Sequence, residues 1–319
     1  MPMQIKIGID MMGGDFAPLE AVKGLQKFFS DDKAASITVF AIGDEAILQP
    51  LFVEHNIPDS VRIIHAPEII GYHESPTRAL KEKTKSSIAI GFYMLSEGKI
   101  DAFMSAGNTG AMMVGTMYSI KTIEGVLRPT IPTVIPKLNG ATGLLLDVGL
   151  NADCKPEHLN QFALLGSLYC QYILNTDSPK VGLINVGEEE GKGNNLAQAT
   201  YPLLKENSQI NFVGNIEGRD LFIDKADVMV CDGFTGNIIL KLAESFYDIA
   251  KSRGVHEDPY FNRFHYEGYG GTPVLGVSKP VIIGHGISSA VAFVNMMHTA
   301  IQMVETDLCS KIQSSFSTL

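Results

Sequence analysis

Short apolar runs alternate with longer segments of helical periodicity along most of the chain. Residues 5–10 alternate in the manner of a strand, and the helical pattern of 17–29 follows. Further strands are predicted at 36–42, 61–66, 100–105, 181–186, 210–213, 228–231 and 281–284, and further helices at 157–174, 195–206, 237–253 and 290–304. This order predicts an α/β fold with a mainly parallel sheet in three layers.

Two segments depart from the alternation. Apolar runs at 132–138 and 141–148 flank Asn139-Gly140, which predicts an antiparallel hairpin with a type I′ turn inserted into the sheet. Residues 252–276 are rich in glycine and aromatic residues without a clear period and are expected to form a flexible excursion. We expect one α/β catalytic domain over 1–319, with two lobes around a central cleft as the alternative.

Glycine-rich turns follow five of the predicted strands. They are Met12–Asp15, Ser105–Gly110, Gly187–Asn194, Asp232–Asn237 and Gly284–Ser289. A strand that leads into a helix places free backbone N–H groups beside the positive helix pole, and glycine allows an anion to approach them. Such junctions gather at one edge of an open α/β sheet. The pattern predicts a phosphate or oxyanion site built from several loops.

Composition excludes several other classes. Hydrophobic residues make up 45% of the chain and charged residues 19%, as in ordinary globular proteins. The net charge of −10 argues against a nucleic-acid partner. Four widely spaced cysteines without a CxxC pair indicate reduced thiols. With no signal-peptide pattern and no apolar run of about 20 residues, we expect a cytoplasmic location.

The turn around Lys192 resembles a nucleotide-binding loop only superficially. Three residues, not four, precede Gly191-Lys192, Gly193 stands at the Ser/Thr position, and the glutamates of 188–190 would repel a polyphosphate. Lys192 could instead neutralise a single phosphate. The alternative is a solvated lysine paired with the neighbouring glutamates.

The turn around His285 permits two interpretations. Gly284-His285-Gly286 occurs too late in the chain for a dinucleotide fingerprint, because no strand follows to carry the ribose-binding acid. His285 is either a donor in an oxyanion pocket or a buried histidine paired with a carbonyl. Asn108, Thr109 and Asn237 are likewise either anion donors or ordinary turn residues.

Two groups of charged residues are further candidates for binding. Arg78, Lys81, Lys83 and Lys85 share one predicted helix surface, which is either a solvated face or a docking site for an acidic partner. Asp10 and Asp15 lack a third ligand at a recognisable spacing, so we expect turn and cap roles for them and no metal or cofactor.

Taken together, the motifs resemble the bacterial phosphate acyltransferases, the acyl-[acyl carrier protein]:phosphate transacylases of phospholipid synthesis. The matching segments are 10–15, 101–111, 146–158, 182–194, 215–220, 230–237, 269–271 and 280–286. The resemblance implies a fold similar to phosphotransacetylases and isopropylmalate dehydrogenases. It also implies a homodimer, acyl carrier protein and inorganic phosphate as partners, and a membrane glycerol-3-phosphate acyltransferase as the user of the product.

The expected roles follow from this reaction. Lys192, His285 and Asn108 are the expected catalytic residues, and Arg78, Lys81 and Lys85 the carrier-docking residues. The expected phosphate-binding residues are Gly107, Asn108, Thr109, Gly110, Lys192, Gly236, Asn237, Gly286 and Ser288. Two alternatives remain open: a phosphotransacetylase acting on a coenzyme A thioester, and a non-catalytic carrier-protein or membrane adaptor.

One segment departs from the family pattern. Family members often carry a long amphipathic helical pair where 252–269 is short and polar, with Pro259 and several charges interrupting its aromatic residues. We therefore expect at most weak or indirect contact with the inner face of a membrane.

Overall fold

The computed structural model describes residues 4–30, 36–255 and 258–317. The chain forms two compact units: the first runs up to Thr122 and includes Glu267–Cys309, and the second comprises Ile123–Tyr266 and the residues from Ser310 onward. The predicted α/β class with mainly parallel strands is confirmed. The strands divide into two sheets, one in each unit, instead of forming the single sheet expected.

The first unit contains a six-stranded sheet in the order β10-β11-β4-β1-β2-β3. Its elements are β1 (Ile5–Asp10), α1 (Leu19–Phe29), β2 (Ile37–Gly43), α2 (Glu45–Glu54), β3 (Val61–His65), α3 (Pro76–Glu82), α4 (Ser87–Ser96), β4 (Ala102–Ser105), α5 (Thr109–Gly115), the π-helix η2 (Thr116–Ile120), β10 (Gly271–Pro273), β11 (Val281–Gly284) and α10 (Ala290–Glu305). All strand pairs are parallel except β10–β11.

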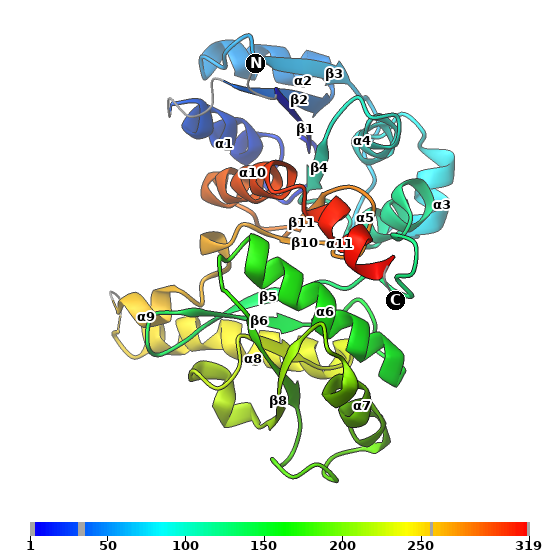
Figure 1. Ribbon diagram of the computed structural model, residues 1–319. Helices are drawn as coiled ribbons and strands as arrows, with labels where there is room; N and C mark the ends of the chain where they lie inside the picture. The colour runs from blue at the N-terminus through cyan, green and yellow to red at the C-terminus, as the bar shows by residue number, and fades with distance from the viewer. Residues whose placement is uncertain (1–3, 31–35, 256–257, 318–319) are drawn as a thin grey trace. The chain divides into compact units, whose positions relative to one another are not determined.

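Helices cover both faces of this sheet. Helix α10 packs against α1 and contacts β11, β4 and β1, while α4 contacts β1, β2 and β4. Figure 1 shows α1 and α10 on one face and α4 on the other. This is the predicted layering: a sheet covered on both faces buries its central strands, and all four residues of β4 are buried.

The second unit contains a five-stranded sheet in the order β5-β6-β9-β7-β8. Its elements are β5 (Thr133–Pro136), β6 (Thr142–Leu146), α6 (Pro156–Tyr172), β7 (Lys180–Ile184), α7 (Asn195–Glu206), β8 (Asn211–Ile216), the 3₁₀ helix η3 (Gly218–Phe222), β9 (Val228–Val230), α8 (Gly233–Ser252) and α9 (Pro259–Asn262). Two further helices, η4 (Tyr266–Gly268) and α11 (Leu308–Phe316), include residues of both units.

The predicted hairpin is present, but its turn differs from the expected type. Strands β5 and β6 pair antiparallel, with Thr133 opposite Leu145. Gly140 has a φ of 88° and donates its N–H to the Lys137 carbonyl (3.1 Å), whereas Asn139 does not have a positive φ. A type I′ turn needs positive φ at both positions. Asn139 instead uses its side chain to accept the Ala141 N–H.

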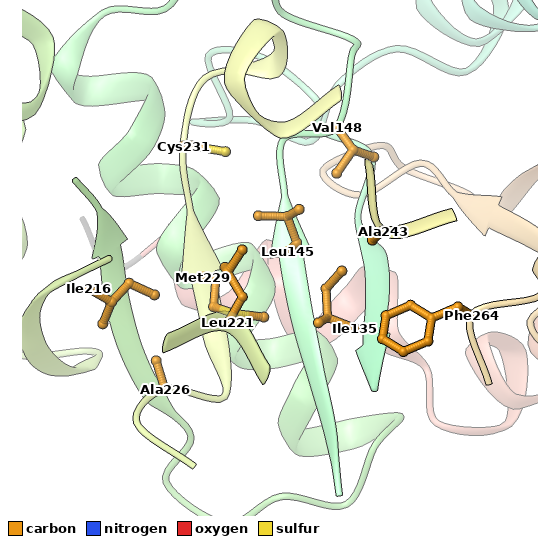
Figure 2. Packing of buried hydrophobic residues seen from close by; sticks show 10 residues of the cluster. All are labelled: Ile135, Leu145, Val148, Ile216, Leu221, Ala226, Met229, Cys231, Ala243 and Phe264. Carbon is orange, nitrogen blue, oxygen red and sulfur yellow. The ribbon is translucent and has the colours of Figure 1, made fainter. Parts of the chain in front are cut away.

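The core of the second unit includes part of the segment expected as a flexible excursion (Figure 2). Phe264 is 6% exposed, packs in the same cluster as Ile135 and Met229, and stacks edge-on with the ring of Phe246. Residues 252–276 also contain α9 and β10. The aromatic side chains that obscure any period in the sequence fix this segment to the core, because each buries a large apolar area.

Helix α8 starts four residues earlier than predicted. Glycine disfavours helix interiors, so the sequence placed the start at Asn237, after two glycines. In the structure Asp232 caps the helix by accepting the Thr235 N–H (2.9 Å), and Gly233 and Gly236 lie in the first turn.

Among the described residues, no helix is both long and apolar enough to span a bilayer.

Candidate active site

Three of the five glycine-rich turns meet at one edge of the first unit's sheet. Strands β11, β4 and β1 are neighbours in the sheet and run parallel. The turns that follow them, which start at Gly284, Ser105 and Met12, therefore lie at the same carboxyl edge. This is the arrangement in which α/β proteins bind ligands.

Buried Asp10 organises two of these turns. One carboxylate oxygen accepts the N–H groups of Met12 (3.0 Å) and Gly13 (3.1 Å), and the other accepts the Ser105 hydroxyl (2.6 Å). The same hydroxyl oxygen accepts the Gly107 N–H (2.9 Å). Burial raises the pKa of Asp10, and its hydrogen bonds partly oppose that shift. The expected turn role of Asp10 matches these contacts.

The glycines of the two turns are needed for close approach. A Cβ atom on Gly13 would lie 2.4 Å from the Asp10 carboxylate and 2.6 Å from the Gly107 nitrogen. A Cβ on Gly107 would lie 3.1 Å from the same carboxylate. Real Cβ atoms do not tolerate the first two distances, so Gly13 serves the packing of the turns whether or not an anion binds there.

The side chain of Asn108 forms hydrogen bonds within the protein. Its side-chain oxygen accepts the Ala111 N–H (2.9 Å) at the start of α5, and its amide nitrogen donates to the Gly71 carbonyl (2.8 Å). The side chain is 5% exposed. Its donors therefore tie the β3–α3 connection to the turn, which differs from the expected direct donation to an anion. Thr109 is exposed, and Gly110 packs against Pro76.

The third turn is held by the first and by α1. The Asp15 N–H donates to the Gly286 carbonyl (2.7 Å), and the Ser288 hydroxyl donates to the His285 carbonyl (2.6 Å). The Ser288 hydroxyl proton is thus used inside the turn. His285 is half-buried. Glu20 of α1 accepts the Ala290 N–H (2.8 Å) at the start of α10.

Tyr72 is a candidate site residue that sequence reasoning missed. Its hydroxyl donates to the Ala106 carbonyl (3.2 Å), and a Cβ on Gly286 would lie 3.0 Å from it, so Tyr72 lies against two of the turns. Burial and the nearby Asp15 carboxylate raise the pKa of Tyr72 to about 12. The phenol therefore stays protonated and keeps its bond to the Ala106 carbonyl. No motif marks this tyrosine, because the irregular β3–α3 connection carries it.

The second unit places its turns at the ends of β6, β9 and β7, which are also adjacent. Strand β7 leads to α7, which contacts β8, and β9 leads to α8, which contacts β6. The chain thus leaves these neighbouring strands in opposite directions, which makes a topological switch point. A cavity of about 210 Å³ lies there, with Asn185, Asn194 and Asp232 among its lining residues.

Lys192 lies on the exposed β7–α7 loop. Its ammonium nitrogen is 3.9 Å from a carboxylate oxygen of Glu189, and about half of its side chain is exposed. Asn185 holds the loop by donating to the Lys192 carbonyl (3.0 Å). The neighbouring glutamates Glu188 and Glu190 pair with lysines outside the loop. The arrangement keeps a cation available near the switch point, although it also matches the solvated, glutamate-paired lysine.

Gly236 and Asn237 were expected in a phosphate-binding turn, but both lie in helix α8. A Cβ on Gly236 would lie 1.9 Å from the Asp147 carbonyl oxygen, so this glycine allows α8 to pack on the end of β6. Asn237 is exposed and donates to the Val148 carbonyl (3.1 Å). The contacts of both residues pack helix α8 against the end of strand β6. Binding of phosphate by either residue stays a prediction.

Asp147 is the buried acid of this edge. Its carboxylate accepts the Asn151 N–H (2.5 Å) and the Ile131 N–H (3.1 Å). Burial raises the pKa of Asp147 against the effect of these bonds. Lys192 and Asp147 belong to the second unit, whereas His285 and Asn108 belong to the first. The expected convergence of Lys192 and His285 on one anion therefore stays a prediction.

The expected docking residues lie on and just after α3. Arg78 pairs with Glu82 of the same helix (2.9 Å), and both side chains are largely exposed. The ammonium nitrogen of Lys83 instead forms an ion pair with a carboxylate oxygen of Glu74 (2.6 Å). Lys81 and Lys85 are exposed. The helix surface is basic and solvated, as both interpretations of the sequence require.

The structure places the chain in a known fold class. It is similar to a phosphotransacetylase from Streptococcus pyogenes with a TM-score of 0.68 at 15% identity, covering 95% of this chain and 94% of that one. It is also similar to the EutD phosphotransacetylase from Staphylococcus aureus, with a TM-score of 0.65 at 17% identity and 94% of each chain covered. The phosphotransacetylase-like fold implied by the sequence is thus confirmed.

Comparison of the amino-acid sequence with known proteins identifies the family within this fold class. Residues 5–253 match the family model described as "Fatty acid synthesis protein". The chain is 42% identical over 327 residues to a phosphate acyltransferase from Dictyoglomus turgidum, covering 97% of this chain and 96% of the relative. It is 40% identical over 337 residues to one from Aquifex aeolicus, covering 99% and 98%. The chain belongs to the phosphate acyltransferase family and is an acyltransferase.

Proposed function

We propose that the protein transfers the acyl group of an acyl-[acyl carrier protein] thioester to inorganic phosphate. A phosphate oxygen attacks the thioester carbonyl, the C–S bond breaks, and the products are acyl phosphate and the free carrier thiol. The observation that carries the proposal is the meeting of three glycine-rich turns, with His285 in one of them, at one sheet edge in a chain of this family. The product would supply phospholipid synthesis through a membrane glycerol-3-phosphate acyltransferase.

The reaction requires little proton transfer. Phosphate is largely dianionic near pH 7, by analogy with a second pKa of about 6 for phosphoserine, so it is already nucleophilic. A thiol of pKa about 8.5 leaves readily. The enzyme must hold two anionic reactants together and stabilise the tetrahedral oxyanion, for which preorganised N–H groups and cations are suited.

The residues divide between these two tasks. Lys192 neutralises phosphate from an exposed loop, which fits its partial pairing with Glu189. His285 stabilises the oxyanion or the departing thiolate. Asn108 contributes by fixing the turn that carries Thr109, since its own side chain is bound to Ala111 and Gly71. Tyr72, whose hydroxyl proton is bonded to the Ala106 carbonyl, contributes by holding two of the turns together.

The direct test is phosphate-dependent release of free carrier from palmitoyl-[acyl carrier protein]. Free carrier and acyl phosphate are each measured by mass spectrometry. We expect both products to appear with phosphate and neither when sulfate replaces it. Turnover of acetyl coenzyme A but not of the carrier substrate would indicate the phosphotransacetylase alternative. Carrier binding without any acyl transfer would indicate the adaptor.

Carrier recognition is proposed to use the exposed basic residues around α3. Attraction between opposite charges raises association rates at low salt. Reversing the charges of Lys81 and Lys85 to glutamate should raise KM for the carrier substrate several-fold and leave KM for phosphate unchanged. Reversal of Lys251, an exposed lysine near the end of α8, is the control. An unchanged carrier KM at low ionic strength would refute docking here.

We further propose a homodimer with at most weak membrane contact. Four apolar side chains of α8 are more than half exposed, at positions 234, 238, 242 and 249, and a second copy could cover them. Light scattering at several concentrations tests the dimer, and Leu242→Glu should weaken it.

The aromatic rings of Tyr260 and Phe264 pack on each other in the second unit, which leaves less apolar surface there for a membrane. Strong flotation with anionic liposomes would contradict this proposal.

A further inference from the structure

A groove in the first unit lies between three helical segments that the proposed chemistry has not used. It has a volume of about 610 Å³ and is formed by α3, α4 and the continuous α5–η2 segment. Each segment contributes two residues four positions apart: Thr77 and Lys81 from α3, Ala89 and Tyr93 from α4, and Val114 and Tyr118 from the α5–η2 segment. The spacing shows that one face of each helix is directed to the groove.

The lining of the groove is mainly apolar, and its floor is well packed. Phe92 is 1% exposed and packs edge-on against Phe103. A Cβ on Gly115 would lie 2.2 Å from the Phe92 ring, so the glycine lets the two helices meet closely beneath the groove. The volume is within the range of about 300–1,000 Å³ for small-molecule sites, which are mostly apolar with a few polar groups.

The rim supplies those polar groups. Tyr93 and Tyr118 are 54% and 74% exposed and both line the groove, and the Tyr93 hydroxyl accepts a hydrogen bond from the Lys99 ammonium (3.3 Å). Lys81 lines the same groove and lies in the basic surface that also includes Arg78 and Lys85. The groove is therefore apolar inside with a cation at its entrance, which matches an apolar chain attached to an acidic partner.

The groove is also connected to the glycine-rich turns. Helix α5 begins at Thr109, directly after the turn that contains Gly107 and Asn108. Val114, a groove residue, stands five residues later, which is roughly 8 Å along a helix axis at 1.5 Å per residue. A thioester carbonyl at the turn could therefore extend its hydrocarbon chain beside α5 into the groove.

We propose that this groove binds the hydrocarbon chain of the acyl thioester substrate, with the carrier seated over the basic rim at Lys81. The proposal rests on the proposed function and adds the subsite that selects a long chain. Each methylene buried in the groove should strengthen binding roughly fourfold. The enzyme should therefore prefer long-chain over short-chain carrier substrates.

The test is to fill the groove and compare chain lengths. Ala89→Phe and Val114→Phe place a ring in the groove from two different helices, α4 and α5. Each should lower kcat/KM for a sixteen-carbon carrier substrate at least tenfold and change the value for a four-carbon substrate by less than about threefold. Ala46→Phe is the matched control, because Ala46 lines a different depression at α2 and β3 of the same unit. It should change neither value.

A binding measurement separates the two proposals. Fluorescent cis-parinaric acid should bind the wild type, and both groove variants should weaken this binding at least tenfold, whereas Ala46→Phe should not. Equal loss for both chain lengths, or unchanged binding in both correctly folded groove variants, would overturn the groove assignment. Absence of phosphate-dependent turnover in the wild type would overturn the proposed function, and the binding result would still decide the groove.

Discussion

The carboxyl edges of the two sheets differ in how their polar side chains are used. In the first unit, Asp10 and Ser105 bond to each other and to backbone N–H groups of adjacent turns, and Asn108 binds a neighbouring connection. In the second unit, Lys192 lies on an exposed loop with its nearest carboxylate oxygen 3.9 Å away. The glycine-rich turns of the first edge form a closed network, whereas the second edge has buried bonds at Asp147 and, in addition, an exposed lysine at its surface.

This difference suggests a division of labour in the proposed reaction. An oxyanion is best stabilised by donors that do not reorganise during the reaction, and the interlocked turns of the first unit provide such a frame. A substrate ion that enters from solvent and leaves as part of the product suits an exposed cation on a flexible side chain. The predictions below test whether the two edges act as one site and whether they differ as described.

The largest effect on catalysis is expected from removing the side chain of His285 or of Lys192. His285→Ala and Lys192→Ala should each lower kcat/KM on the order of 10²-fold, the usual scale for one oxyanion donor. If both residues act on the same transition state, the double variant should lose clearly less than the product of the two single effects. Steady-state kinetics with the carrier substrate measures all three.

Lys205→Ala is the control for this cycle, because Lys205 pairs with Glu190 beside the same loop but lies on α7. It should retain activity within about twofold. Near-wild-type turnover in either single variant would refute that residue's role. Full multiplicativity of the two losses would indicate that the two edges act independently.

Alanine at two glycines should distinguish the closed turns of the first unit from the exposed Lys192 loop of the second. Gly13→Ala places a methyl group against the Asp10 carboxylate and the Gly107 nitrogen, and should lower the free energy of unfolding by about 1–3 kcal/mol, the typical cost of overpacking. Gly191→Ala in the Lys192 loop meets nothing within 4 Å and should change it by less than about 0.5 kcal/mol. Urea unfolding of both variants checks the contrast. Equal effects would contradict it.

Asparagine-to-alanine changes extend the same comparison. Asn108→Ala removes a helix cap and leaves the Gly71 carbonyl without its donor, which should cost about 2–3 kcal/mol. Asn237→Ala removes one bond from an exposed side chain and should cost at most about 1 kcal/mol. Thermal and urea unfolding measure both. A larger loss at Asn237 would reverse the assignment of the closed network to the first unit.

The smallest effect concerns the pH dependence of the third turn. A hydrogen bond from Lys23, followed by one from the Ala290 N–H, lowers the pKa of Glu20 from its usual 4.5. The folded state therefore favours the carboxylate, so this stabilisation is present above about pH 4.5 and is lost as the pH falls through the folded-state pKa. Glu20→Gln should destabilise the protein near neutral pH, and the difference from the wild type should shrink in acid. A constant difference from pH 3 to 7 would contradict this.

Much of the architecture could be predicted from local pattern. Strand β1, helix α7 and strand β11 begin at or within one residue of the predicted positions, because each has a clear period bounded by turn residues. The site was predicted less completely. The turns after β1, β4 and β11 do meet at one edge, but Tyr72 was missed, and Asn108 has its donors directed into the protein.

The sequence by itself determined the fold class, the order of elements, the glycine-rich turns and the family, since these depend on local periodicity and on motifs. Only the tertiary structure decided that the strands form two sheets, that Gly236 and Asn237 lie within a helix, and that the residues around Phe264 pack into a core. The physical reason is the same in each case. Long-range packing against Asp147, Met229 and similar partners outweighs local preferences that favour a turn or a loop.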